Sequence, residues 1–407
     1  MNYHAYQTYV DLMSPMRFLA EAAHSSLANP ALAQCDSLRK LSAACEVFMA
    51  SKVTHSRPDF QLATVMTGEG KAAHEVAVFE EAAHIAPFAT LLHFRKEGIS
   101  GQPRVLIVAP MSGHFATLLR ETIRTMLADH DVYITDWHNA RDVPLSAGRF
   151  GLDEYTEYVM DFLRIMGPGS HLMAICQPCV PALAAASIMA EDRDKAQPRS
   201  LTLMAGPIDC RINPTKVNQL ATSKPLDWFK NNLISPVPWR HKGAMRRVYP
   251  GFLQLSAFMS MNPDRHMGAF KGLYQDLVAG EIEKAGTTRA FYEEYFAVLD
   301  MDAEFYLETI QYVFQEYALA QGELKWRGRS VNPAALRRTA LLTVEGEKDD
   351  ICSLGQTMAA HDLCSSIPPF LKSHHMQAGV GHYGVFSGRR WNQQIYPIVR
   401  EMIYSAP

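Results

Sequence analysis

The sequence contains no run of about 18 apolar residues, no long basic run, and no basic N-terminal segment followed by an apolar core. We therefore expect no membrane span, no nucleic-acid binding and no secretory signal. Cysteine is scarce, with seven residues in a chain of 407, and this small, odd set favours a reducing cytoplasm over a disulfide scaffold. Internal repeats and low-complexity segments are absent as well. The composition, 48% hydrophobic and 20% charged with a formal net charge of −3, is typical of a globular protein with one large domain or two ordinary ones.

The most informative stretch is residues 171–185, HLMAICQPCVPALAA. Its first residues are typical of a short apolar strand, and its last residues are typical of a buried, Ala-rich helix. A sharp strand-to-helix turn that carries a nucleophile is the nucleophile elbow of α/β-hydrolases, and here the nucleophile position holds Cys176. The flanking Ala174 and Pro178 stand where glycines are usual, but alanine is small and proline is tolerated in a first helical turn. Two alternatives stay open: Cys176 is a small buried hydrophobic residue, or it forms a C-x-x-C redox pair with Cys179.

Strands and helices alternate on both sides of this turn, which predicts a mostly parallel α/β sheet and the α/β-hydrolase fold. The expected strands cover residues 75–79, 89–94, 104–110, 131–136, 171–174, 200–204, 339–344 and 371–376, and the expected helices cover 116–128, 152–166, 180–189, 355–366 and 391–404.

The pattern divides the chain into three parts. Residues 1–70 are expected to form a helical N-terminal extension, and residues 71–209 together with 339–407 form the catalytic domain. Residues 210–338 show no convincing strand, and 290–320 has a strongly helical pattern. We expect this insertion to be a helical cap or lid over the carboxyl edge of the sheet, where ligands bind in open α/β folds.

Cys176, Asp349 and His382 follow the order nucleophile, acid, histidine of α/β-hydrolases, and each comes just after a predicted strand. In this arrangement His382 takes the thiol proton, and Asp349 holds the far nitrogen of the imidazole. The thiolate then attacks an ester carbonyl. Three residue types in this order therefore predict a catalytic triad with a cysteine nucleophile.

The oxyanion of such a reaction needs backbone donors near the nucleophile. We expect these to be the N–H of Gln177, which follows the nucleophile, and that of Met111 or Ser112, which follow the strand at 104–110. His114 lies in the same loop, but it precedes the nucleophile in the chain and so does not fit the hydrolase order. We assign His114 to the loop and not to the triad.

The acid and the histidine each have an alternative. Asp350 adjoins Asp349, and Asp209 follows the preceding strand, where some α/β-hydrolases carry their acid. The G-x-x-D spacing from Gly346 favours Asp349. The alternative for His382 is a histidine in a turn with no catalytic role, but its position in a glycine-flanked loop near the C-terminus favours a catalytic one.

Six short motifs are distributed over nearly the whole chain. They are AICQP at 174–178, AGPID at 205–209, RVYPGF at 247–252, MNPDR at 261–265, VEGE at 344–347 with Asp349-Asp350, and GHYGVFSGRRW at 381–391. In these motifs, and in its helical N-terminus, the sequence resembles the intracellular poly(3-hydroxybutyrate) depolymerases, a polyhydroxyalkanoate depolymerase family. The resemblance implies a Cys–Asp–His triad on an α/β-hydrolase fold, and Cys176, Asp349 and His382 match those positions. It also implies hydrolysis of amorphous poly(3-hydroxybutyrate) in cytoplasmic storage granules to 3-hydroxybutyrate oligomers and monomer.

The expected partner is therefore the polymer or the granule surface, and we predict neither a cofactor nor a metal. We expect Trp228, Trp239 and Phe252 of the insertion to line the path of the polymer or to contact the granule. A homodimer is left open. A reversible disulfide between Cys179 and Cys176 that silences the enzyme is a separate hypothesis.

Three competing functions remain. A polyhydroxyalkanoate synthase-like acyltransferase shares the triad and fold, but its elbow is G-x-C-x-G, and Ala174 and Pro178 argue against it. A non-catalytic granule-associated protein would not need an intact triad. A thioredoxin-like oxidoreductase would use Cys176 and Cys179, but it would leave Asp349 and His382 without a role.

Overall fold

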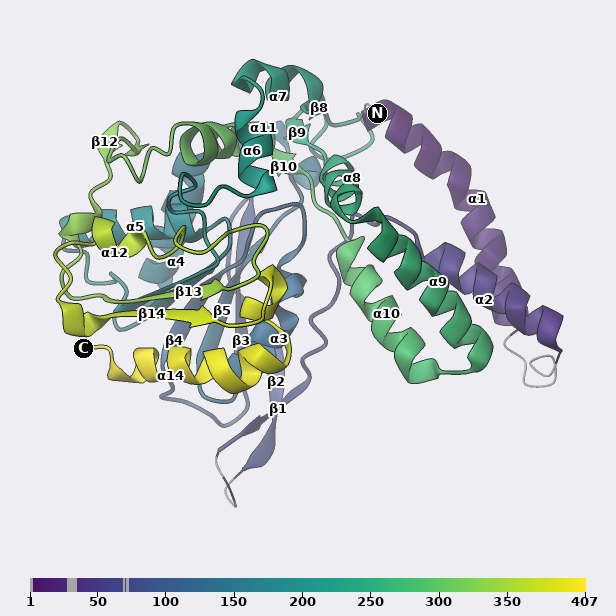
Figure 1. Ribbon diagram of the computed structural model, residues 1–407, viewed down its shortest axis with the longest axis horizontal. Helices are drawn as coiled ribbons and strands as arrows, with labels where there is room; N and C mark the ends of the chain where they lie inside the picture. The colour runs from purple at the N-terminus through teal and green to yellow at the C-terminus, as the bar shows by residue number, and fades with distance from the viewer. Residues whose placement is uncertain (1–2, 28–34, 69, 71–72) are drawn as a thin grey trace.

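A nine-stranded sheet forms the centre of the molecule (Figure 1). The computed structural model describes residues 3–27, 35–68, 70 and 73–407. The strand order is β1-β2-β3-β5-β4-β6-β7-β13-β14. The bounds are β1 Thr64–Thr67, β2 His74–Ile85, β3 Ala89–Lys96, β4 Arg104–Val108, β5 Asp131–Trp137, β6 His171–Ile175, β7 Ser200–Met204, β13 Ala340–Gly346 and β14 Lys372–Gln377.

The sheet is parallel from β5 to β14 and antiparallel at the β1 to β3 edge. Four of the five side chains of β4 are buried, as are all of those of β6 and β7, which explains the continuous apolar runs in the sequence. Helices α4 (Leu152–Met166) and α5 (Cys179–Glu191) cover one face, and α14 (Tyr396–Ser405) covers the other (Figure 1). This arrangement confirms the predicted α/β-hydrolase fold.

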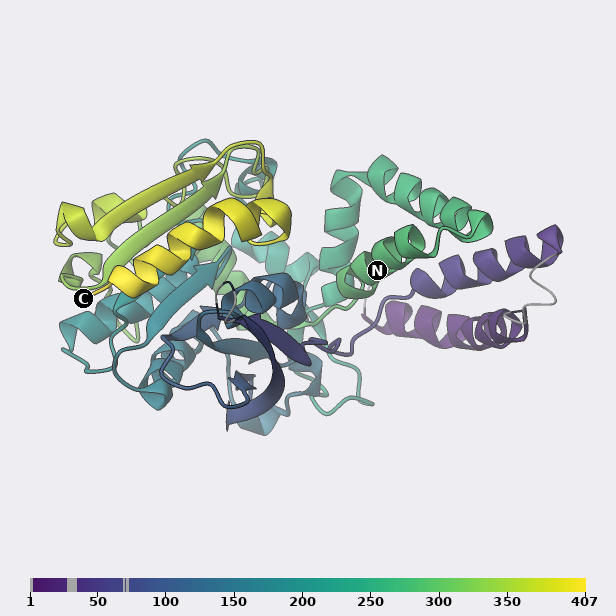
Figure 2. The ribbon, with the colours of Figure 1, turned by 90° about the horizontal axis from the view of Figure 1, so that it is seen from below.

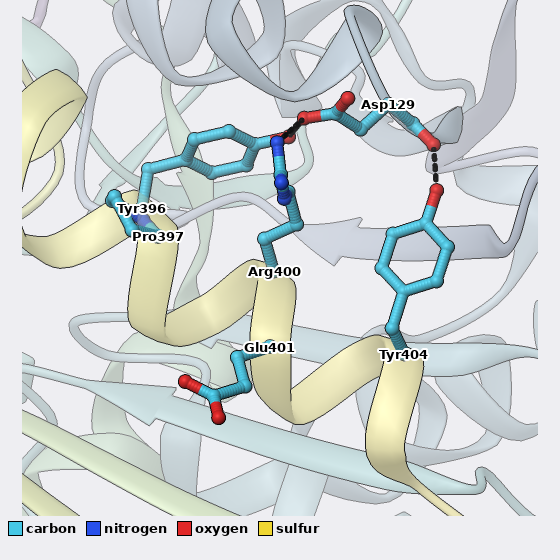
Figure 3. A pocket seen from close by; sticks show the side chains of 6 residues that line it. All are labelled: Asp129, Tyr396, Pro397, Arg400, Glu401 and Tyr404. Atoms are coloured by element: carbon cyan, nitrogen blue, oxygen red, sulfur yellow. Dashed lines mark hydrogen bonds and ion pairs between the residues drawn. The ribbon is translucent and has the colours of Figure 1, made fainter.

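The C-terminal helix α14 is fastened to the turn before β5. The hydroxyl of Tyr396 donates to Asp129 Oδ2 at 2.6 Å, and the Tyr404 hydroxyl donates to the Asp129 carbonyl at 2.9 Å. Arg400 pairs with the same carboxylate at 3.3 Å (Figure 3). These side chains line a surface pocket in which Asp129 is already bonded, so its role is to hold the helix in place.

The N-terminal helices form part of a helical arm. Helix α1 (Tyr3–Leu27) packs on α2 (Asp36–Ala50), which packs on α9 (Pro263–Ala279) of the insertion, and α9 packs on α10 (Ile282–Tyr295). Figure 2 shows that these four helices project away from the sheet. The helical extension predicted for residues 1–70 ends earlier, because β1 already pairs with β2. None of the helices described combines the length and the apolar character needed to cross a bilayer.

The insertion lies over the carboxyl edge of the sheet. Its helices include α6 (Lys216–Thr222), α7 (Leu226–Asn232), α8 (Gly251–Met261) and α11 (Ala303–Glu308). The expectation of no strands was wrong, since short strands β8 (Ser235–Pro236), β9 (Arg247–Tyr249) and β10 (Met301–Asp302) form a small sheet. A second pair joins β11 (Lys325–Trp326) to β12 (Arg329–Ser330).

The continuous helix predicted over 290–320 is interrupted. Helix α10 ends at Tyr295, and β10 pairs with β9 before α11 begins. A π-helical segment (Thr309–Gln315) then follows α11. The extended stretch is stabilised by partners distant in sequence: Val298 N–H donates to the Thr54 carbonyl and Leu299 N–H to the Gly113 carbonyl, each at 2.9 Å. The helix expected at 355–366 is likewise reduced to α12 (Ala360–Leu363).

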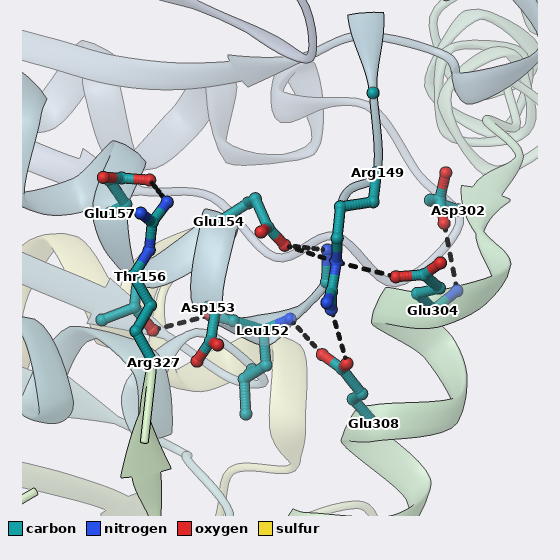
Figure 4. A network of polar contacts seen from close by, with 12 residues as sticks. Arg149, Leu152, Asp153, Glu154, Thr156, Glu157, Asp302, Glu304, Glu308 and Arg327 are labelled. Carbon is teal, nitrogen blue, oxygen red and sulfur yellow. Dashed lines mark hydrogen bonds and ion pairs between the residues drawn. The ribbon is translucent and has the colours of Figure 1, made fainter. Parts of the chain in front are cut away.

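A charge network joins the insertion to α4 (Figure 4). The Arg149 guanidinium lies between Glu154 of α4 and the carboxylates of Glu304 and Glu308 of α11, at 3.4, 2.9 and 2.9 Å. Glu308 also accepts the Leu152 N–H at the first turn of α4, at 2.6 Å. A carboxylate at a helix N-terminus is favourable, so this network helps to set the position of the insertion above the sheet.

Candidate active site

Cys176 occupies a sharp turn between β6 and α5. Its φ angle is +67°, in the left-handed region that residues other than glycine rarely adopt and that is typical of a nucleophile elbow. The turn is held on both sides: the Cys176 N–H donates to the Met204 carbonyl at 2.8 Å, and the Cys176 carbonyl accepts the Cys179 N–H at 3.1 Å. The backbone therefore raises Cys176 at the carboxyl end of the central strand.

Cys179 has a packing role in this turn. It is fully buried on the first turn of α5, and its thiol donates to the Ala174 carbonyl at 3.3 Å. Burial raises the pKa of this thiol well above its usual value. The neighbouring strand approaches so closely that a Cβ on Gly206 would lie 2.2 Å from the Cys179 Sγ. Glycine at 206 is thus required by the packing of the elbow.

His382 and Asp349 meet beside Cys176. Asp349 follows β13, His382 follows β14, and the Nδ1–H of His382 donates to Asp349 Oδ2 at 2.7 Å. The other carboxylate oxygen of Asp349 accepts the N–H groups of Ile351 and Cys352 at 2.9 and 2.8 Å. Both side chains of the pair are almost fully buried, so the imidazole has one fixed orientation. Cys176 lies beside this pair, since its charge raises the pKa of His382 and both residues line the same cavity.

The electrostatics of the pair favour a protonated histidine. Burial lowers the pKa of His382, but the charges of Cys176 and Asp349 and their hydrogen bonds raise it more, so that its pKa lies well above the usual 6.5. A positive imidazolium next to a thiol is the arrangement that stabilises a thiolate. The site can therefore hold a nucleophile and a proton donor side by side.

The alternative acids are engaged elsewhere. Asp209 forms a two-point ion pair with Arg211, at 2.9 and 2.7 Å, and this guanidinium lowers the pKa of Asp209. Asp350 points to solvent. His114 is buried in the loop after β4, its Nε2 lies 3.2 Å from the Tyr295 carbonyl, and burial lowers its pKa to about 4.

The predicted oxyanion residues lie at the same edge. The Met111 N–H contacts the side-chain Oε1 of Gln177 at 3.4 Å, which brings the loop after β4 next to the residue that follows Cys176. The Ser112 carbonyl accepts a hydrogen bond from the side-chain amide of Gln254 in α8. The structure thus brings Gln177, Met111 and Ser112 together around Cys176.

A cavity of about 230 Å³ lies between this edge and the insertion. Cys176, His382, Met111, Ser112 and Gln177 form its catalytic-domain side. The side from the insertion is largely apolar and includes Phe229, Phe258, Phe305, Tyr306, Ile310 and Phe314. These residues are not among those predicted from the sequence. Gln254 was also missed, although a single glutamine in the apolar sequence of α8, GFLQLSAFMSM, is a signal.

The three aromatic residues expected to meet the polymer are not part of this cavity lining. The prediction that Phe252 meets the polymer was wrong, because this side chain is 5% exposed and stacks on Tyr6 of α1 with ring centroids 3.9 Å apart. It therefore fastens α1 to the insertion. Trp228 and Trp239 are exposed, Trp239 by 83%, so contact of these two with a granule stays a prediction. Within the described ranges, no group of three His, Cys, Asp or Glu side chains is arranged to hold a metal.

Comparison with known proteins gives one family and a set of related folds. Residues 205–406 match the family model described as PHB de-polymerase C-terminus, whereas no curated protein matches the chain. A 2-hydroxy-6-oxo-6-phenylhexa-2,4-dienoate hydrolase from Rhodococcus sp. strain RHA1 is 12% identical, with coverage of 81% of this chain and 100% of that one and a TM-score of 0.43. A thermophilic esterase from Thermogutta terrifontis is 12% identical, with 83% and 98% coverage and a TM-score of 0.41. A monoacylglycerol lipase from Paleococcus ferrophilus is 11% identical, with 75% and 96% coverage and a TM-score of 0.43.

Proposed function

The chain belongs to the PHB depolymerase family through residues 205–406, and we propose that it hydrolyses amorphous poly(3-hydroxybutyrate) of storage granules to 3-hydroxybutyrate oligomers and monomer. The coarser function, hydrolysis of carboxylic esters, follows from the family and the fold. The observation that carries the finer proposal is the hydrogen bond from His382 to Asp349, with Cys176 beside this pair at the wall of an apolar cavity.

The reaction begins with the thiolate of Cys176 and the imidazolium of His382. The sulfur attacks the ester carbonyl carbon, and the carbonyl oxygen becomes an oxyanion. When the C–O bond of the ester breaks, the leaving alkoxide takes the Nε2 proton of His382 and departs as an alcohol. The product at this stage is an acyl-cysteine and a neutral imidazole. Asp349 keeps the Nδ1 proton in place throughout.

Deacylation uses the same groups in the opposite direction. The neutral His382 removes a proton from water, and the resulting hydroxide attacks the thioester carbonyl. The C–S bond breaks, the acid leaves, and the thiolate–imidazolium pair is restored. The backbone N–H groups of Gln177 and Met111 hold the oxyanion in both steps. The Gln177 Oε1 contact on the Met111 N–H is long, at 3.4 Å, so a substrate oxygen can replace it.

The cavity supports a polyester chain as substrate. Ester units of this polymer carry methyl and methylene groups, which suit the aromatic and aliphatic wall of the insertion. Because the nucleophile lies beneath the insertion, one chain must leave its neighbours to reach it. Amorphous polymer permits this more readily than crystalline polymer. The exposed Trp228 and Trp239 are proposed contacts to the granule surface.

The test is hydrolysis of native amorphous granules, followed by loss of turbidity and by release of 3-hydroxybutyrate. We expect release by the wild type and by Cys35→Ser, a matched control at an exposed cysteine, and none by Cys176→Ala. Release by Cys176→Ala would place the nucleophile elsewhere. If the folded wild type releases nothing, coenzyme A release from a 3-hydroxybutyryl thioester tests the acyltransferase alternative.

A further inference from the structure

Two glutamine side chains line the cavity next to the nucleophile, and each has one amide atom bonded and one without a partner. Gln177 Oε1 accepts the Met111 N–H, and Gln254 Nε2 donates to the Ser112 carbonyl. Among the described residues, the buried Gln177 Nε2 and Gln254 Oε1 have no hydrogen-bond partner. Both residues line the cavity, so one donor atom and one acceptor atom beside it lack a partner.

The orientation of both amides is set by the main chain. A backbone N–H can only donate, so the atom of Gln177 that faces Met111 must be the oxygen. A backbone carbonyl can only accept, so the atom of Gln254 that faces Ser112 must be the nitrogen. The remaining amide atoms are therefore a donor, Gln177 Nε2, and an acceptor, Gln254 Oε1. Exchange of oxygen and nitrogen would break a bond in each case.

Burial of an unpaired polar atom is unfavourable. Polar atoms of this kind in a largely apolar pocket are suited to complementary groups on a ligand. Ester oxygens can satisfy the donor of Gln177, because they accept hydrogen bonds. They cannot satisfy the acceptor of Gln254. In a chain of 3-hydroxyacyl esters, the neutral hydrogen-bond donor is the free hydroxyl at one end.

The position of Gln254 fits this hydroxyl. Its amide bonds to Ser112, adjacent to the Met111 N–H that is a proposed oxyanion donor. Its side chain also lies against the loop, since a Cβ on Gly113 would be 3.0 Å from the Gln254 side-chain carbon. A hydroxyl two carbons from the carbonyl carbon of the acyl group at Cys176 lies within a few bonds of the oxyanion.

We propose that Gln254 Oε1 accepts a hydrogen bond from the free 3-hydroxyl of the acyl group at Cys176, and that this bond makes the enzyme selective for the hydroxyl end of a 3-hydroxyacyl polyester. This inference rests on the proposed function. The acyl-cysteine then carries one hydroxyl-bearing unit, and the shortened chain leaves as the alcohol. Thr309, whose buried hydroxyl also has no partner among the described residues, can donate or accept and does not discriminate.

The first test compares two p-nitrophenyl esters, one of 3-hydroxybutyrate and one of butyrate. We expect the wild type to prefer the hydroxylated ester by about tenfold in kcat/KM, the equivalent of one hydrogen bond, and Gln254→Met to lose this preference. A ratio that is unchanged in Gln254→Met overturns the proposal.

The ratio separates substrate contact from a structural effect, because both esters use the same nucleophile and oxyanion donors. Equal hydrolysis of both esters by the wild type overturns the role of Gln254 and leaves ester hydrolysis standing. Hydrolysis of neither ester, together with no release of 3-hydroxybutyrate from granules, overturns both proposals.

A second measurement needs only the wild type, in case Gln254→Met does not fold. It compares 3-hydroxybutyrate trimers with a free hydroxyl end and with an O-acetylated end. We expect the trimer with the free hydroxyl to be cleaved about tenfold faster than the acetylated trimer. Equal rates contradict the proposal.

Discussion

Asp349 and His382 are 33 residues apart in the chain, and the His382 Nδ1–H donates to Asp349 Oδ2 at 2.7 Å. They meet because β13 and β14 are adjacent parallel strands, whose carboxyl ends lie at the same edge of the sheet. The pair is buried, and the carboxylate is also held by two backbone N–H groups. The histidine therefore cannot turn away from Cys176 without breaking a charged hydrogen bond.

The Asp349→Asn variant should lower kcat/KM by roughly 10²–10⁴-fold on a soluble ester, since the amide loses the charge that stabilises the imidazolium. It should also change the pH profile. Acylation needs protonated His382, so kcat/KM falls as pH rises through the pKa of His382, which is held well above 6.5. Removal of the Asp349 charge lowers that pKa and moves the alkaline fall to lower pH. Asp350→Asn, at the exposed neighbour, is the matched control. If kcat/KM of Asp349→Asn falls at the same alkaline pH as in the wild type, Asp349 is not the partner of the catalytic histidine.

Gly206→Ala should destabilise the protein by about 1–3 kcal/mol or more, the usual range for overpacking. The new Cβ would lie 2.2 Å from the Cβ and Sγ of Cys179 and 3.1 Å from the Cys176 carbonyl oxygen. Gly272→Ala in α9 is the control, because a Cβ there meets nothing within 4 Å, and alanine is favoured over glycine in a helix by about 0.5–1 kcal/mol. Urea unfolding of both variants measures the contrast. Equal stability would show that the elbow can relax.

Cys179→Ala should leave the response to mild oxidation unchanged. The thiol is buried with its pKa well above the usual value, and thiol–disulfide exchange requires a thiolate. Wild type and variant should therefore lose esterase activity at the same rate in oxidised glutathione. Protection of the variant would support the alternative, a silencing disulfide between Cys179 and Cys176.

Asp300 should make the stability depend on pH below neutrality. This carboxyl is fully buried, and burial raises its pKa from 3.8 to about 6 in the folded protein. Between these two values the folded state binds more protons than the unfolded state, so the free energy of unfolding falls as pH rises. The shift of about two pKa units corresponds to about 3 kcal/mol.

The Asp300→Asn variant cannot titrate, and it keeps an oxygen for the Gly251 N–H, which Asp300 accepts at 2.8 Å. Relative to this variant, the wild type should lose about 3 kcal/mol of stability between pH 4 and pH 7. Thermal or urea unfolding across that range checks the difference. If the free energy of unfolding changes with pH in the same way in both proteins, Asp300 does not change its charge in this range.

Phe252→Ala should release α1 and leave the chemistry intact. Phe252 is packed between Tyr3 and Tyr6 of that helix, with ring centroids at 5.7 and 3.9 Å. Loss of a buried phenylalanine costs about 3–5 kcal/mol. We expect faster proteolysis within α1, with hydrolysis of a small ester little changed. Trp228→Ala, at an exposed aromatic residue, is the control and should leave α1 protected.

Much of the central fold followed from the sequence. The bounds predicted for α4 and β7 agree with the structure, because buried strands and amphipathic helices carry their periodicity in neighbouring residues. The elbow around Cys176 was visible for the same reason, since strand, turn and helix are consecutive. Asp349 and His382 could be proposed because each comes at the end of a parallel strand.

The insertion depended on tertiary structure. The interruption of its helix is stabilised by partners such as Thr54 and Gly113, far away in the chain, so no local pattern in the sequence predicts it. Phe252 is a similar case: an aromatic residue looks the same in sequence whether it meets a ligand or stacks on Tyr6. The unpartnered amide atoms of Gln177 and Gln254 exist only once α8 lies over the loop after β4. Local periodicity thus determined the sheet, the elbow and the order of the candidate triad, whereas contacts between distant segments decided the cavity, because burial and hydrogen bonding there depend on which surfaces meet.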